Sequence, residues 1–137
     1  IFATMIYGIL DIRANRFTWS RAGHDSLLHL SKNGGCQFLT PSGIGLGLDS
    51  GRRFDSTLEE LNLKMDNGDF LLLFTDGITE AQNESGEFYD EKRLKKLLKR
   101  EKTNSSKELR DLIVEDVRTF IGDERQFDDM TLVVIKA

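Results

Sequence analysis

Three aspartates stand beside two apolar segments, where their carboxylates could act together. Asp76 directly follows the apolar run Phe70–Phe74, within FTDGITE. Asp128 and Asp129 directly precede a second apolar run that begins at Met130, within DDMTLVVI. If these two runs are neighbouring antiparallel strands, the end of one lies beside the start of the other. The spacing then places two or three of these carboxylates at one edge of a sheet.

Carboxylates gathered at one edge repel one another, and one of them must take up a proton unless a cation neutralises the group. Hard oxygen ligands of this kind suit Mg²⁺ or Mn²⁺ rather than zinc. Gly77 allows the backbone to turn sharply after Asp76, and Thr79 and Glu80 are expected to begin a short helix. A purely structural interpretation also stands, because Asp-Gly is a common turn and an Asp before a strand often only caps its end. Spacing alone leaves both open.

The hydrophobic pattern predicts the elements that would position the aspartates. The runs 70–74 and 130–135 lack alternation, which indicates short strands covered on both faces. Residues 40–53, rich in glycine and containing Pro41, are expected to be a loop. Alternation and β-branched or aromatic residues predict further strands, paired through turns, over 2–11, 16–21, 26–30, 36–39 and 57–65.

Two helices are predicted between the apolar runs. Apolar residues at helical spacing, with Asp90 placed to cap, predict a helix over 90–100. Ser105 and Glu108 form a capping box for a second helix, and Gly122 stands where its C-terminal cap belongs. Successive hairpins joined to helices predict an α+β fold, with one or two antiparallel sheets and helices packed on a face. We expect residues 1–137 to form a single unit.

Composition excludes several classes of protein. The 137 residues are 39% apolar and 31% charged, a globular profile of one-domain size. Nineteen basic and 23 acidic residues give a net charge of −4, so nucleic-acid binding is not expected. The lone Cys36 excludes a disulfide framework and a cysteine zinc cluster. No apolar run approaches the about 18 residues of a membrane span, so no membrane contact is expected from this segment.

An Asp-Gly-x-Thr sequence after an apolar strand also occurs in haloacid-dehalogenase-type phosphatases. In those enzymes a nucleophilic Asp stands two residues before the Asp of Asp-Gly. Here that position is Phe74, which cannot attack phosphorus. Those enzymes also begin with the motif and continue in βα alternation, whereas several predicted strands precede it here. This interpretation is therefore disfavoured.

Taken together, FTDGITEA, FDDMTLVVI, AGH at Ala22–His24 and GIGLGL resemble PPM-type metal-dependent protein serine/threonine phosphatases, in their bacterial SpoIIE/RsbU-like branch. The resemblance implies an antiparallel β-sandwich with flanking helices and a binuclear Mn²⁺ or Mg²⁺ centre at one edge. Carried over by position, Asp76 and Asp128 are the catalytic metal ligands. Asp129, at a position where relatives also have Asn, would orient or hydrogen-bond a ligand. Gly77 and His24 would support the ligands without binding metal.

The resemblance also implies an activity. Water activated by the metals would attack a phosphoserine or phosphothreonine directly, without a covalent enzyme intermediate. The substrate would be a phosphorylated bacterial regulatory protein, such as an anti-sigma-factor antagonist, in the cytoplasm. A sensor or regulatory domain would precede the phosphatase domain in the parent protein.

Two upstream motifs of the family do not occur in this chain. They are a Gly-Asp segment and an Asp-x-Ser-Gly-His-Gly segment, which supply the bridging carboxylate and a carbonyl ligand. We therefore expect this chain to be the C-terminal part of the domain, with weak metal binding and little or no hydrolysis. The alternative function is a catalytically inactive binding or regulatory module of the same fold.

Three other features have simpler interpretations. His24 is expected to have a structural or supporting role rather than a catalytic one. GIGLGL resembles a dinucleotide-binding sequence, but no predicted helix follows it, so it is interpreted as a loop. It also lacks the Pro-Leu-Gly frequent in family relatives. The basic residues between Lys92 and Lys102 are interpreted as a solvated helix face, with docking of an acidic partner as the other possibility.

Overall fold

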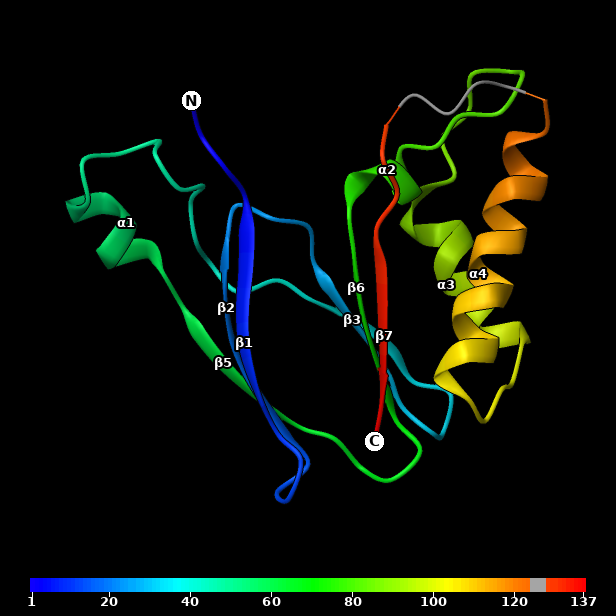
Figure 1. Ribbon diagram of the computed structural model, residues 1–137, viewed down its shortest axis with the longest axis horizontal. Coiled ribbons are helices and arrows are strands. Elements are labelled where there is room, and N and C mark those ends of the chain that lie inside the picture. The colour runs from blue at the N-terminus through cyan, green and yellow to red at the C-terminus, as the bar shows by residue number, and fades with distance from the viewer. Residues whose placement is uncertain (124–127) are drawn as a thin grey trace.

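The computed structural model describes residues 1–123 and 128–137. Within these residues the strands form two antiparallel sheets in separate layers (Figure 1). The three-stranded sheet has the order β1-β2-β5, with β1 at Met5–Asp11, β2 at Arg16–Ala22 and β5 at Glu60–Lys64. The four-stranded sheet has the order β4-β3-β6-β7, with β4 at Cys36–Leu39, β3 at Leu27–Leu30, β6 at Phe70–Phe74 and β7 at Leu132–Lys136. The predicted antiparallel α+β sandwich is confirmed.

Helices cover the outer face of the four-stranded sheet. These are α3, at Asp90–Arg100, and α4, at Ser106–Ile121, both with the predicted bounds (Figure 1). The short helix α2, at Asp76–Thr79, directly follows β6, and α1, at Arg52–Thr57, precedes β5. In the described part of the chain, no helix combines the length and the apolar character needed to cross a membrane.

The helix ends follow the predicted capping chemistry. The Ser105 hydroxyl accepts a hydrogen bond from the backbone N–H of Glu108, at 3.4 Å. The Asp90 carboxylate accepts one from the N–H of Arg93, at 2.8 Å. Gly122 ends α4 with a φ of 66°, in the left-handed region that glycine adopts without strain.

Two local predictions were wrong. Residues 52–57 form α1, where a loop and the start of a strand were expected, and β5 begins only at Glu60. The helix forms there because the Asp49 carboxylate accepts the N–H of Gly51 and that of Arg53, at 3.0 and 2.9 Å, near the helix start.

The helix after β6 begins at Asp76 and ends at Thr79, whereas Thr79 and Glu80 were expected to begin it. The N–H of Glu80 closes this turn on the carbonyl of Asp76, at 2.7 Å. Two strands also differ slightly from their predicted bounds. β1 begins at Met5 instead of residue 2, and β7 spans Leu132–Lys136 instead of 130–135.

The sheets and helices enclose two apolar clusters, and β6 contributes to both. Leu71 joins the cluster between the sheets, with the stacked rings of Phe17 and Trp19. Leu72 and Phe74 belong to the cluster between the four-stranded sheet and the helices α3 and α4. Because consecutive strand residues point to opposite faces, both faces of β6 are covered, which explains its lack of alternation.

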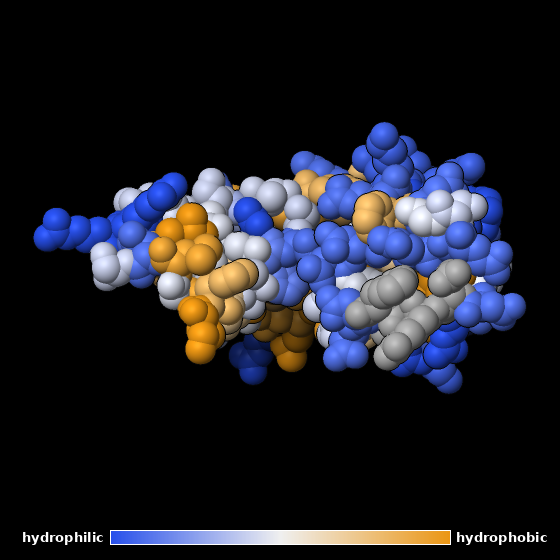
Figure 2. Space-filling model, turned by 90° about the horizontal axis from the view of Figure 1, so that it is seen from above, coloured by the Kyte–Doolittle hydropathy of each residue, from blue (hydrophilic) through white to orange (hydrophobic). Residues whose placement is uncertain are grey.

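Apolar side chains remain exposed on the three-stranded sheet. Met5, Tyr7 and Ile9 alternate along β1 and are 43%, 65% and 60% exposed. Seen from above, the side of the molecule that holds the helices is mostly hydrophilic, and apolar side chains gather toward the three-stranded sheet (Figure 2). On this face, exposed apolar side chains are therefore concentrated on the side of the three-stranded sheet.

A buried carboxylate ties together the turns before β6. Asp69 is 4% exposed and accepts hydrogen bonds from the backbone N–H groups of Lys32 and Asp66, at 2.8 and 3.0 Å. It is also 2.9 Å from Nε2 of His29. Burial opposes ionisation of Asp69, but these hydrogen bonds outweigh it and lower the pKa of the carboxyl.

Asp69→Asn is expected to lower the free energy of unfolding by about 2 kcal/mol at neutral pH, because an amide cannot accept all three bonds. A lowered folded-state pKa stabilises the fold above the unfolded-state pKa, and this contribution is lost as pH falls through the folded-state value. The difference from the wild type should therefore shrink below about pH 4. Urea unfolding of both proteins at several pH values measures it. A difference that is constant with pH would contradict the ionic interpretation.

Candidate active site

The pairing of β6 with β7 brings the two acidic segments to one edge of the four-stranded sheet. Phe74 is paired with Leu132, at the end of β6 and the start of β7. Beyond this pair, the N–H of Thr75 donates to the carbonyl of Thr131, at 3.1 Å. The antiparallel neighbours assumed from the sequence are confirmed, and Asp76 follows directly on one segment while Asp129 precedes the other.

The side chain of Thr75 joins the two segments further. Its hydroxyl donates to the carbonyl of Asp129 at 3.2 Å and accepts from the N–H of Thr131 at 3.0 Å. Sequence reasoning missed this residue. The signal was a hydroxyl directly before the Asp-Gly pair, at the point where the strand ladder ends.

Gly77 does not serve the sharp turn that was predicted for it, and its predicted support of the metal ligands stays a prediction. Its φ does not lie in the left-handed region, so the turn does not require glycine for conformational freedom. Glycine is required by space, because a Cβ there would overlap the carbonyl oxygen of Asp129 and lie 2.9 Å from its carbonyl carbon. The absence of a side chain thus lets the first turn of α2 pack directly on the acidic segment before β7.

The three predicted carboxylates are exposed to solvent. Asp76 is the first residue of α2. The Asp128 carboxylate accepts the backbone N–H of Asp129 at 2.7 Å, which fixes the turn into β7. Phe127, which opens the motif FDDMTLVVI, lies outside the described residues. The shared edge is as predicted, and the roles of Asp76 and Asp128 as metal ligands stay predictions.

Asp25 is a fourth carboxylate at this edge, which sequence reasoning missed. It is half-buried between β2 and β3. Burial raises the pKa of the Asp25 carboxyl, and the negative charge of nearby Asp76 raises it further, against opposing effects of His24 and Arg21. The available signal was its position directly after AGH. Acidic side chains therefore approach one another from two strand connections.

His24 lies in the connection between β2 and β3. Its carbonyl accepts a hydrogen bond from Nη1 of Arg21, whose Nε donates to the carbonyl of Pro41 at 2.9 Å. Its Nδ1 is buried and has no hydrogen-bond partner among the described residues. The described contacts of the backbone at His24 are those of a structural residue, and its predicted support of metal ligands stays a prediction.

The glycine-rich segment packs against the AGH turn. The N–H of Gly23 donates to the carbonyl of Gly43 at 3.0 Å, and a Cβ at Gly23 would lie 2.8 Å from the backbone nitrogen of Gly45. GIGLGL thus fits close to another backbone segment rather than opening a helix, as the loop interpretation predicted.

The donors at the edge suit a hard divalent cation in chemistry. They are carboxylate oxygens, and the influence of Asp76 on the pKa of Asp25 reflects the mutual repulsion that a cation would relieve. Among the residues that the structure describes, no three His, Cys, Asp or Glu side chains are grouped closely enough to hold a metal ion. Asp76 and Asp128 fit as part of a ligand set.

The fold, with its acidic sheet edge, is that of a phosphatase domain of the PP2C (PPM) type. Comparison with solved structures shows the same fold: the chain superposes on the Mn-presoaked phosphatase domain of SpoIIE from Bacillus subtilis with a TM-score of 0.74. That match has 24% identity and covers 98% of this chain and 56% of the other. The family model for stage II sporulation protein E (SpoIIE) matches residues 1–137. The chain therefore belongs to the SpoIIE family of phosphatase hydrolases.

Two sequence relatives agree with this assignment. Protein IcfG of Synechocystis is 30% identical over 135 residues, which are 98% of this chain and 20% of that protein. Phosphoserine phosphatase RsbU of Bacillus subtilis is 28% identical over 137 residues, which are 99% of this chain and 39% of that protein. The chain thus spans well under half the length of these relatives.

Proposed function

We propose that this chain is the catalytic-edge portion of a metal-dependent phosphatase that hydrolyses phosphoserine or phosphothreonine on a regulatory protein. One observation carries the proposal: Asp76 and the Asp128–Asp129 segment lie at one sheet edge, joined through the hydroxyl of Thr75. Membership of the SpoIIE family supports it, since RsbU, a relative, is named a phosphoserine phosphatase.

Asp76 and Asp128 are proposed to hold Mn²⁺ or Mg²⁺. When bound, such cations neutralise phosphoryl oxygens and lower the pKa of water. The chain's own residues set the geometry of the ligands: Thr75 ties the two segments, and Gly77 permits their close approach. Asp129 is proposed to orient a ligand. The Asp128 carboxylate accepts the backbone N–H of Asp129, and this bond fixes the two residues relative to each other.

The substrate is proposed to be a phosphorylated bacterial regulatory protein, such as an anti-sigma-factor antagonist. An exposed acidic edge favours a protein substrate, because a phosphorylated side chain on a protein surface can reach it without entering a deep pocket. A sensor or regulatory domain in the parent protein belongs to the same proposal.

The test compares the complete gene product with the 137-residue chain, using a phosphoserine peptide and Mn²⁺. The complete product is expected to release phosphate, and this release is expected to stop when the metal is chelated. The isolated chain is expected to release little or none, because Asp76 and Asp128 are only part of a ligand set. Mn²⁺-dependent turnover by the isolated chain, abolished by Asp76→Ala, would show that expectation to be wrong. A complete product that is inactive with Mn²⁺ and Mg²⁺ would overturn the proposed function.

A second candidate is a catalytically inactive binding module of the same fold. One observation favours it: within the described residues no three potential ligands are grouped for a metal ion. The same comparison separates the two functions, because an inactive module would leave the complete product without phosphatase activity.

A further inference from the structure

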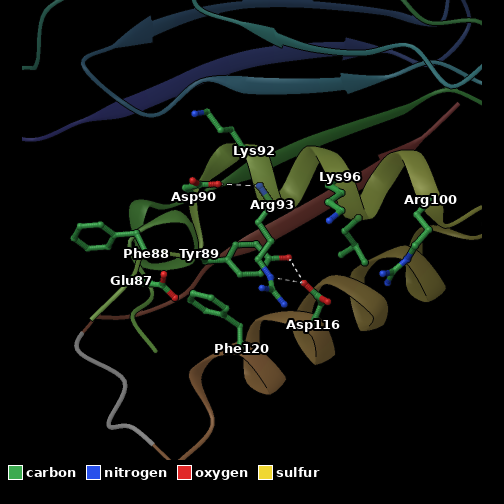
Figure 3. A pocket seen from close by; sticks show the side chains of 11 residues that line it. Glu87, Phe88, Tyr89, Asp90, Lys92, Arg93, Lys96, Arg100, Asp116 and Phe120 are labelled. Carbon is green, nitrogen blue, oxygen red and sulfur yellow. Dashed lines mark hydrogen bonds and ion pairs between the residues drawn. The ribbon is translucent and has the colours of Figure 1, made fainter. Parts of the chain in front are cut away.

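A groove lies between α3 and the C-terminal half of α4, away from the acidic sheet edge (Figure 3). Its volume is about 700 Å³. Charged and aromatic side chains from both helices and from the segment before α3 line it. They include Phe88, Tyr89, Lys92, Arg93, Lys96 and Arg100. The basic helix face noted in the sequence therefore borders a concave surface.

The floor of the groove is fixed by a compact set of contacts. The hydroxyl of fully buried Tyr89 donates to Oδ2 of Asp116 at 2.7 Å, and Nε of Arg93 donates to the same oxygen at 3.3 Å. The Arg93 guanidinium lies 4.5 Å from the ring centre of Phe120. Arg93 and Asp116 thus neutralise each other, and the aromatic rings restrain them.

The rim carries cations in a line. Lys92, Lys96 and Arg100 follow one another at four-residue spacing along α3. In Figure 3, Lys96 and Arg100 point toward α4, whereas Lys92 points to the other side of α3. All three are exposed. Arg100 pairs with Glu101 at 2.7 Å, while the side chains of Lys92 and Lys96 form no hydrogen bond or ion pair with another described residue.

The carboxylates of the groove are already engaged, unlike these lysines. Glu87 accepts a hydrogen bond from Nδ2 of Asn83 at 2.8 Å, and Asp90 accepts the N–H of Arg93. Asp116 is bound by Tyr89 and Arg93. Four cations and three carboxylates line the groove, so its lining is net positive by one charge, although the whole chain carries −4.

We propose that this groove docks an acidic segment of a partner protein. Carboxylates of the segment face Lys92, Lys96 and Arg100, and an apolar side chain rests on Phe88, which is 54% exposed at one end of the groove. The three cations span about 12 Å of helix. An extended segment of about four residues covers that length, so a short acidic motif fits.

Nucleic acid fits the same surface less well. Glu87, Asp90 and Asp116 are interspersed with the cations, and a uniformly charged phosphate backbone would be repelled by them. A protein segment can place carboxylates opposite the cations and neutral residues opposite the acids. The groove also includes none of the residues proposed to hold metal, so docking does not depend on the proposed activity.

The test is fluorescence anisotropy at low ionic strength with the full 137-residue chain and a labelled peptide of about eight residues, in which Glu and Asp alternate with neutral residues that include one Phe. Lys92→Glu with Lys96→Glu is expected to weaken binding about tenfold. A control with the same charge change, Lys64→Glu with Lys107→Glu, alters exposed lysines outside the groove and should stay within about twofold. Phe88→Ala should weaken binding about threefold.

Circular dichroism of each variant checks that it is folded. Absence of peptide binding at millimolar concentration would overturn the proposal, and so would equal losses in the two double variants. Equal binding by a peptide with Gln and Asn in place of Glu and Asp would also overturn it. Tighter binding of a single-stranded oligonucleotide through Lys92 and Lys96 would assign the groove to nucleic acid instead.

Discussion

Gly77→Ala is expected to destabilise the domain by about 3 kcal/mol, because the added methyl group has no space. Its Cβ would overlap the carbonyl oxygen of Asp129, and the obstacle is backbone that cannot rotate away. The segment before β7 would have to move, and the hydrogen bond from the Thr75 hydroxyl to that carbonyl would be lost. Urea or thermal unfolding of the 137-residue chain measures the change.

Gly35→Ala is a matched control for this substitution. Gly35 also lies outside the left-handed region, and the closest atom to an added Cβ is the hydroxyl of Ser31, at 2.8 Å. A side-chain hydroxyl can rotate, so the cost should be about 1 kcal/mol or less. If Gly77→Ala costs no more than Gly35→Ala, the close packing of α2 on the Asp129 segment is contradicted.

Asp76→Asn is expected to lower kcat for a phosphoserine peptide by about 10³-fold in the complete gene product. An amide keeps the shape of the side chain but loses the charge that would hold a divalent cation. Folding should be retained, because Asp76 is exposed and its charge only adds repulsion at Asp25. Phosphate release at saturating Mn²⁺ measures the loss of kcat, and calorimetric titration with Mn²⁺ measures the loss of metal binding.

Two further variants sharpen this test. Asp129→Asn should cost about 10- to 100-fold at most, since an orienting role is less demanding than direct coordination. Glu80→Gln removes an exposed carboxylate directly after α2 and should leave activity unchanged. A loss at Glu80 as large as the loss at Asp76 would indicate that overall negative charge, rather than a particular ligand, sets the rate.

The sequence predicted elements best where a short-range signal defined them. Helix α4 has the bounds set by Ser105 and Gly122, because capping depends on residues within one turn. β6 matches its apolar run, because burial on both faces requires continuous apolar residues. By contrast, α1 was missed, since its start is stabilised by the carboxylate of Asp49 in a glycine-rich stretch with no apolar periodicity.

The acidic edge was predictable because antiparallel pairing of two apolar strands determines which ends meet. Asp76, Asp128 and Asp129 could therefore be selected from the sequence. Their link through the Thr75 hydroxyl could not, because a hydroxyl can bond in many directions and only the register of β6 and β7 aims it at Asp129. Asp25 was missed for the same reason: its nearness to Asp76 depends on how β3 sits beside β6.

By itself, then, the sequence determined most element types, the two apolar strands and the acidic residues at their ends, because local propensity and side-chain periodicity determine these. Of the two strands expected to be covered on both faces, only β6 is; β7 lies at the edge of the sheet and leaves Val133 48% exposed. Tertiary structure alone decided that Gly77 is required by space rather than by backbone freedom. It also decided that the basic residues of α3 border a groove in which Tyr89 and Arg93 both bind Asp116. Both depend on contacts between segments far apart in the chain, and such contacts leave no periodic trace in the sequence.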